Sequence, residues 1–233
     1  MTLLLLSAFP AFAGERLFGF SYGYGTVPKG GVEVEQYATA EEEGGGIGWQ
    51  HQVEVEYGIT DTLEGGLYMV AEQSDGGSLA FAGYKARLRY RLGAQGVGPV
   101  DTALYLEYIG SPSFDTHGVE AKVILAKTIG KFDAAFNAEY AVSLGEVIVH
   151  EVEPTLGLGY HITPSFLLGA EVRSEIEAEG DQAPGVFLWA GPTFHLAGVG
   201  GKIWWTNSLL LAATDDTRGD HAYIYRSLLA VNL

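Results

Sequence analysis

The chain has 233 residues, no cysteine, 33 glycines, and 29 acidic against 13 basic residues, for a formal net charge of −16. This charge argues against a nucleic-acid partner, which needs a basic surface, and the lack of cysteine excludes disulfides and thiolate zinc sites. Hydrophobic residues make up 47% of the chain and aromatic residues 12%, a composition that does not fit an acidic disordered segment.

The first segment has the features of an export signal. Residues 1–13 form an apolar run that ends in the small-x-small pattern AFA, which signal peptidase recognises. The run is shorter than the ~20 residues of a membrane-spanning helix. We therefore expect a signal peptide over residues 1–13, a mature chain that starts at Gly14, and a place in the bacterial envelope. Residues 14–29 show no strand pattern, and we expect either a periplasmic lead-in or a partial plug in a barrel lumen.

From residue 30 onward the sequence alternates between polar and apolar residues. Between Phe81 and Leu92, basic residues occupy every second position from 85 to 91, and apolar or aromatic residues lie between them. In a strand, successive side chains point to opposite faces, so one face carries a ladder of cations and the other is apolar. The same alternation marks the segments that start at Val32, near Val53 and at Leu63.

Eight more strands follow along the chain. They are expected at Thr102–Ile109, Gly118–Thr128, Lys131–Val142, Val147–Tyr160, Ser165–Glu175, Val186–Leu196, Lys202–Ala212 and His221–Leu233. Each is about ten residues long, as a tilted transmembrane strand requires. Mostly short turns alternate with longer polar loops. Together these features predict an all-β fold: a transmembrane, antiparallel up-and-down β-barrel of about 12 strands over residues 30–233, with both ends on the periplasmic side.

Aromatic and basic residues indicate which face meets lipid. Tyr57, Tyr90 and Tyr160 lie near the short turns at the ends of apolar faces, and Trp49 and Tyr140 lie near the long loops. Such girdles are typical of membrane interfaces. When residues are assigned to faces by alternation, no Lys or Arg falls in mid-strand on the apolar face. Two polar residues, His150 and Asn207, do fall on that face, and they mark places where the register could slip. A soluble barrel would reverse these faces.

The chain resembles a known class of envelope protein. The segment TVPKGGVEVEQ at 26–36, followed by EVEYGITD at 54–61, is similar to the openings of uncharacterised outer-membrane barrel families of porin-like or small-transporter type. This resemblance implies location in the bacterial outer membrane and contact with its lipid and lipopolysaccharide, and it carries over no catalytic or binding residue. The outward row of the last strand, from Tyr223 to Leu233, resembles the C-terminal signal that barrel insertion machinery reads.

Charged residues dominate the predicted lumen. The charge ladder and its predicted flanking acids are Lys85, Arg87, Arg89, Arg91, Glu64, Glu72 and Glu107. Further acids predicted on the lumen side are Glu33, Glu35, Glu54, Glu56, Glu151, Glu153 and Glu171. Acids outnumber bases on this face, which favours a narrow passive channel, porin-like, for small polar solutes with a preference for cations. The alternative is a closed structural or adhesive barrel whose interior is filled by salt bridges.

An outer-membrane lipid hydrolase is the third hypothesis. Serine hydrolysis needs a histidine and a serine within hydrogen-bond reach. Of the six histidines, only His150 is turned to the lipid side near the loops, and only Ser143 lies near it in the sequence. We therefore expect no enzyme, no catalytic residues, no metal site and no cofactor.

Overall fold

The computed structural model describes residues 14–180 and 183–233, so the expected signal peptide lies outside the described residues. Twelve strands make up most of this part of the chain. They are β1 (Val32–Glu43), β2 (Gly46–Gly58), β3 (Leu63–Gln73), β4 (Ala80–Leu92), β5 (Asp101–Gly110), β6 (His117–Ile129), β7 (Phe132–Leu144), β8 (Ile148–Thr163), β9 (Phe166–Glu179), β10 (Gly185–Gly198), β11 (Ile203–Ala212) and β12 (Tyr223–Asn232). A 3-10 turn (Val199–Gly201) and a short helix α1 (Asp215–Asp220) complete the elements.

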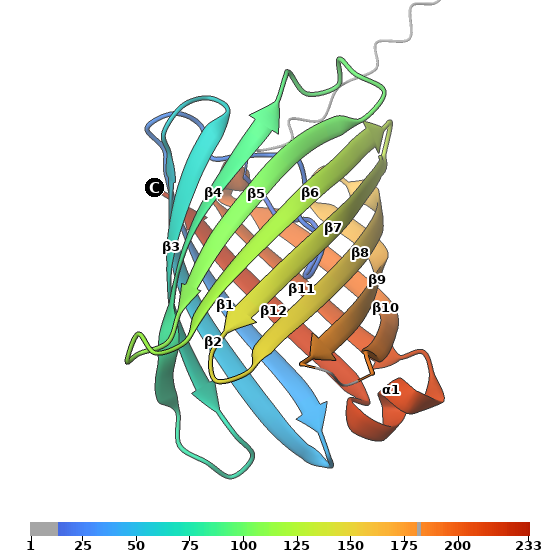
Figure 1. Cartoon of the computed structure of the whole chain (residues 1–233). Coiled ribbons are helices and arrows are strands. Elements are labelled where there is room, and N and C mark those ends of the chain that lie inside the picture. The colour runs from blue at the N-terminus through green and yellow to red at the C-terminus, as the bar shows by residue number, and fades with distance from the viewer. Residues whose placement is uncertain (1–13, 181–182) are drawn as a thin grey trace, which may run out of the picture.

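The strands form one closed antiparallel barrel in chain order. Neighbours along the chain pair with each other, and β1 pairs with β12 from Glu33 opposite Asn232 to Glu41 opposite Ile224. Figure 1 shows tilted strands, with the short turns and the C-terminus at one rim and α1 at the other. The predicted fold class, strand number and strand direction are confirmed.

The strand ends differ from the sequence-based expectation mainly at the long-loop rim. β9 continues to Glu179, which pairs with Val149 of β8, so the ladder extends beyond the predicted end at Glu175. Because antiparallel pairing satisfies the backbone, polar residues continue the strand past the apolar region. The last strand starts at Tyr223 rather than His221, since His221 ends helix α1. Thr214 begins that helix by accepting a hydrogen bond from the Thr217 N–H.

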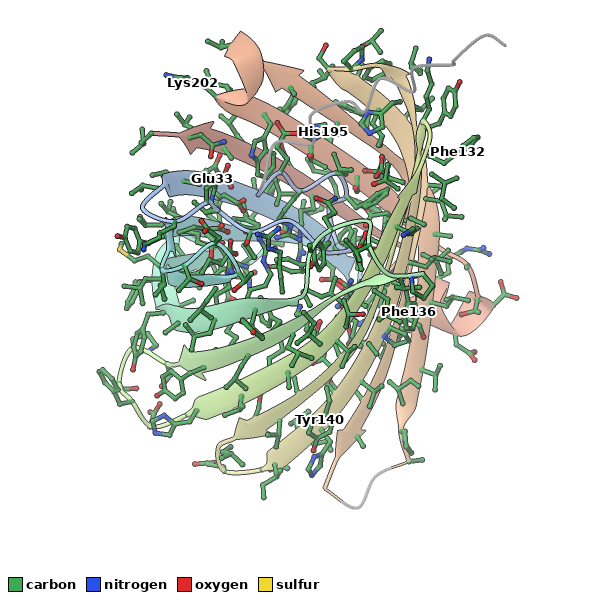
Figure 2. The ribbon with its side chains drawn as sticks, turned by 90° about the horizontal axis from the view of Figure 1, so that it is seen from above. Glu33, Phe132, Phe136, Tyr140, His195 and Lys202 are labelled. Carbon is green, nitrogen blue, oxygen red and sulfur yellow. The ribbon has the colours of Figure 1, made fainter. Side chains whose placement is uncertain are left out.

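The outer surface is an apolar belt. Large hydrophobic side chains on every second residue are exposed, including Leu67 and Met69 at 67% and Leu106 at 53%. Figure 2 shows Phe132 and Phe136 on the outer side of β7, and Glu33 and His195 toward the interior. A continuous apolar surface of this size is unfavourable in water, so it identifies the surface that contacts lipid.

The two polar residues predicted on this outer face have aromatic partners. His150 Nδ1 forms a 2.8 Å hydrogen bond with the Tyr140 hydroxyl, and Tyr225 donates its hydroxyl to Asn207 Oδ1 at 2.7 Å. The pairing continues in register through both residues. The expectation of a register slip at these positions is wrong, because each polar side chain keeps its outward position in an unbroken ladder and bonds to a neighbouring tyrosine. Register shifts occur instead at Val70/Ala71 and His161/Thr163.

Among the described residues, no helix is long and apolar enough to cross a membrane.

Candidate functional site

Arg87 is the centre of an ion-pair cluster inside the barrel. Its Nε lies 2.6 Å from Glu54 Oε1 and its Nη1 lies 2.7 Å from Glu64 Oε1, and Nη2 contacts Glu56 Oε1. All four side chains are buried. Gly66 on β3 leaves the space for this cluster, since a β-carbon there would lie 2.1 Å from Glu54 Oε1. The narrow lumen therefore lets one guanidinium contact acids of both β2 and β3.

Of the other members of the predicted charge ladder, Arg89 shares Glu64 with Arg87 and the rest have partners of their own. Arg89 pairs with Glu64 at 2.8 Å, and Lys85 pairs with Glu107 at 3.1 Å. Arg91 donates to the carbonyl of Asp61 at the short-turn rim. Glu72 accepts a 2.9 Å hydrogen bond from Gln50 Nε2 and lines the same cavity as Lys85. The structure thus brings most of the ladder together with acids, and the ladder does not form an open basic wall.

The other predicted lumen acids lie in three places. Glu153 accepts from Arg173 at 2.6 Å, and Glu151 lies beside it on the wall of a cavity. Glu171 contacts the N-terminal segment, as described below. The remaining pair, Glu33 and Glu35, lies buried on β1.

Residues 14–29 lie inside the barrel and are called the internal segment here. The segment enters at the short-turn rim, runs inward and returns to that rim at the start of β1 (Figure 1). Phe18 packs on Ala135 and Leu167, and Phe20 packs on a cluster around Trp189. Each of these two rings is less than 5% exposed. The segment occupies the lumen on the short-turn side (Figure 1).

Wall side chains hold the backbone of the internal segment. The Glu171 carboxylate accepts hydrogen bonds from the N–H groups of Gly19, Phe20 and Ser21 at 2.8 to 3.0 Å. Asn137 accepts from the Tyr22 N–H at 2.6 Å and donates to its carbonyl at 3.0 Å. These bonds replace the water that an irregular backbone otherwise needs.

Two further wall positions complete this arrangement. Thr206 donates its hydroxyl to the Arg16 carbonyl at 2.5 Å. At Gly157 on β8, a β-carbon would lie 2.6 Å from Phe18 Cγ, so glycine is required for the ring to seat. Sequence reasoning missed the roles of Asn137, Thr206 and Gly157. The sequence feature that could have identified them is an uncharged polar residue or a glycine in the middle of a strand, at a position that faces the lumen.

A polar cavity of about 570 Å³ lies on the long-loop side of the internal segment. Arg16, Phe20 and Tyr22 of the segment line it, and strands β1 to β9 and β12 provide its walls. Its acidic side chains are Glu41, Glu72, Glu107, Glu120, Glu139, Glu151 and Glu153, and its basic side chains are Arg16, Lys85, Lys122, Arg173 and Arg226. Lys122 bridges Glu120 and Glu139, at 2.6 Å from each.

The basic and acidic groups of the cavity are unevenly placed. Arg226 of β12 donates to Thr39 Oγ1 at 3.0 Å, and its guanidinium lies 4.3 Å from the centre of the Phe20 ring. Glu107, Glu120 and Glu139 lie on the wall formed by β5 to β7. Lys85 and Lys122 pair with these three acids, whereas the hydrogen bonds of Arg226 go to a hydroxyl and a backbone carbonyl.

A closed barrel with an apolar outer belt, charged interior and even strand number is a transmembrane β-barrel of the bacterial outer-membrane type. Residues 10–133 match the family described as "Family of unknown function (DUF6662)", and the chain belongs to this family. No curated protein matches its sequence.

Solved outer-membrane barrels share the fold at low sequence identity. The NanC porin has a TM-score of 0.60 at 7% identity, covering 86% of this chain and 100% of its own. The KdgM porin, in complex with disordered oligogalacturonate, has a TM-score of 0.56 at 8% identity, covering 85% and 99%. The translocator domain of the autotransporter NalP from Neisseria meningitidis has a TM-score of 0.53 at 12% identity, covering 87% and 88%. One fold thus serves both porins and a translocator, so function must be argued from the site.

Proposed function

We propose that the protein is a porin-like outer-membrane channel for small polar solutes, which enter the cavity from the long-loop side. The observation that carries the proposal is the cavity of about 570 Å³, whose walls bear seven acidic and five basic side chains. A barrel with a purely structural role does not need a polar cavity of this size. The alternative, a closed barrel with a salt-bridged interior, is supported by the Arg87 cluster and by the internal segment.

The acidic excess of the cavity supports a preference for cations. Fixed carboxylates at a constriction attract cations and repel anions. The same excess disfavours an anionic sugar such as the oligogalacturonate named with KdgM. We infer that cationic and zwitterionic solutes enter this cavity most readily, oriented by the arginines near β12 and the acids of β5 to β7.

Passage to the periplasm requires the internal segment to move. The segment has no regular secondary structure, and its backbone is held by side chains of the wall rather than by strand pairing. Replacing Glu171 and Asn137 removes five hydrogen bonds to residues 19–22. Movement of the segment would join the cavity to the short-turn rim.

Conductance in planar lipid bilayers tests the proposal. The purified wild-type barrel should give a small cation-selective current, and Glu171→Ala/Asn137→Ala should raise it several-fold. Leu158→Val is the matched control because Leu158 faces lipid, is 54% exposed and lies beside the segment's seat on β8. A complete lack of current from the wild type and the double variant would establish the closed structural barrel instead.

We propose no hydrolase activity for the His150 region. The His150 ring is hydrogen-bonded to Tyr140 on the outer face, a partner that supplies no nucleophile of the serine type. Phospholipid hydrolysis by the wild type should equal that of His150→Ala and of protein-free vesicles. Hydrolysis that depends on His150 would restore the enzyme hypothesis.

We also infer that insertion machinery reads the outward row of β12. Leu229 and Val231 are exposed on this strand and alternate with buried Leu228 and Ala230. Leu229→Asn should lower the amount of barrel inserted in cells while leaving unassisted refolding into detergent unchanged. An equal loss in both assays would indicate a stability effect and contradict recognition.

A further inference from the structure

Three buried carboxylates converge where β1 meets β2. Glu33 and Glu35 of β1 and Glu56 of β2 each offer an oxygen, and these oxygens lie within 4.8 Å of one another. Each of the three residues is at most 1% exposed. Glu33 lies directly opposite Glu56 in the strand register, a placement of like charges that destabilises strand pairing.

Each carboxylate has one anchored oxygen and one unpartnered oxygen. Trp204 Nε1 donates to Glu33 Oε2 at 2.9 Å, the Tyr37 hydroxyl donates to Glu35 Oε2, and Arg87 Nη2 donates to Glu56 Oε1. The second oxygens, Glu33 Oε1, Glu35 Oε1 and Glu56 Oε2, are buried without a hydrogen-bond partner. A buried carboxylate oxygen left in this way is costly. The anchors fix the orientation of each group, as outer-shell donors do for metal ligands.

The charges around these groups do not balance. Five buried carboxylates share the region, namely Glu33, Glu35, Glu54, Glu56 and Glu64, and three buried guanidiniums face them, namely Arg16, Arg87 and Arg89. Two negative charges therefore remain in a site shielded from water. Buried charge at this level must be neutralised by protons or by a cation.

We propose that Glu33, Glu35 and Glu56 bind one divalent cation, with Ca²⁺ the best match, between β1, β2 and the internal segment. Ca²⁺ takes carboxylate oxygens at about 2.3–2.6 Å, so two of its ligands can lie up to about 5 Å apart. Small side-chain movements would bring three oxygens that lie within 4.8 Å of one another onto one ion. Its charge equals the two negative charges left over. The sequence pattern predicts no metal site, because parity identifies a shared face but not the convergence of three acids. The site is independent of solute passage and goes beyond the proposed function.

The segment's first residue lies at this site. A β-carbon at Gly14 would be 3.5 Å from Glu33 Oε1. A cation here would therefore join the start of the internal segment to the first strand pair of the barrel. Two other occupants can each neutralise one of the two remaining negative charges: a proton shared between Glu33 and Glu35, or an α-ammonium group on a chain that begins at Gly14.

A second acidic group in the barrel provides the matched control. Glu151, Glu153 and Glu175 also bring their oxygens within 4.8 Å of one another, but they are partly exposed. Arg173 Nη2 lies 2.6 Å from both Glu153 and Glu175. An arginine already occupies the position between these two carboxylates, so the proposal assigns no cation to this group.

The test uses the whole barrel purified from membranes, stripped with EDTA and titrated with Ca²⁺ by calorimetry and with Tb³⁺ by luminescence. The indole of Trp204, bonded to Glu33, should sensitise the Tb³⁺ emission. We expect one Ca²⁺ per barrel, displacement of Tb³⁺ by Ca²⁺, and at least a 100-fold loss of affinity in Glu33→Gln/Glu35→Gln. Glu151→Gln/Glu175→Gln should bind like the wild type.

Thermal unfolding provides a second readout. Ca²⁺ should raise the unfolding temperature of the wild type and leave that of Glu33→Gln/Glu35→Gln unchanged, and without Ca²⁺ the double variant should be at least as stable as the wild type. Binding that survives this substitution or is lost with Glu151→Gln/Glu175→Gln overturns the site. So does an absence of Ca²⁺ binding, which would assign the neutralising charge to the shared proton or, if N-terminal acetylation destabilises the barrel, to the ammonium group.

Discussion

Arg87 shows what the alternation of polar and apolar residues predicts about a single side chain: the face on which it lies, but not the acids that it contacts. Parity places it on the inner face, where it lies. Its direct cross-strand neighbours are Gly66 and Glu107, and register alone would pair it with Glu107. Glu107 pairs with Lys85 instead, because the space above Gly66 lets the guanidinium reach Glu54 and the acids beside it. Which acid an inward-facing arginine contacts depends on how far its side chain reaches across the narrow lumen. The alternation of polar and apolar residues gives the face of the strand but not this reach.

The Arg87 cluster predicts a large stability effect. Arg87→Met should lower the free energy of unfolding by about 3–5 kcal/mol, because it leaves Glu54 and Glu56 buried without a guanidinium and leaves Glu64 with Arg89 alone. Unfolding in urea, followed by tryptophan fluorescence in lipid vesicles, measures the change. Arg218→Met is the control, since the Arg218–Asp215 pair is exposed and its loss should be close to undetectable. Equal effects of both variants would contradict a structural role for the cluster.

At the scale of elements, the strands were predictable, whereas the sequence left a periplasmic lead-in and a partial plug as alternatives for residues 14–29. Strand identity follows from a period of two and a length matched to the bilayer. Residues 14–29 have no period, so their position depends on partners far away in the sequence, such as Asn137 and Glu171. The glycine content illustrates the same division. Turn glycines are expected from sequence, whereas Gly157 is required only because Phe18 packs against it.

Gly157 provides a test of the internal segment that does not alter charge. Gly157→Val adds carbon atoms where the Phe18 ring lies and should displace the segment without removing a hydrogen-bond partner. We expect a several-fold increase in conductance relative to the wild type, with Leu158→Val unchanged. Proteolysis provides a second measurement, because a displaced segment should become accessible to protease from the short-turn side. A Gly157→Val barrel with unchanged current and unchanged protection would contradict the role of the segment as the barrier.

At the scale of the whole molecule, the apolar belt on the outer surface fits the barrel to a lipid bilayer. The apolar belt follows from the same alternation that places charges in the lumen, so topology and lipid-facing residues could be predicted together. Loop-rim details such as helix α1 depend on local capping by Thr214 and lie outside this alternation. The cavity was also beyond sequence reasoning, since its floor is the internal segment.

The depth of a residue in the belt predicts the cost of a charge there. Leu106→Arg, near the middle of β5, should reduce the free energy of unfolding by about 2–4 kcal/mol, and Ile59→Arg, in a rim turn, by about 0–1 kcal/mol. Both side chains are exposed on the outer surface. Reversible unfolding in phospholipid vesicles measures both. A greater cost at Ile59 would place the bilayer midplane away from the middle of β5.

The contacts between the internal segment and the barrel wall also affect how the barrel assembles. Its backbone bonds join residues separated by up to 207 positions, as between Gly19 and Arg226, and the barrel closes only when β1 meets β12. Contacts of such long range form late because a large loop must first be closed. The internal segment therefore reaches its final position late, because its partners on β9, β11 and β12 must first be brought together. Until it does so, the cavity is open to the short-turn rim.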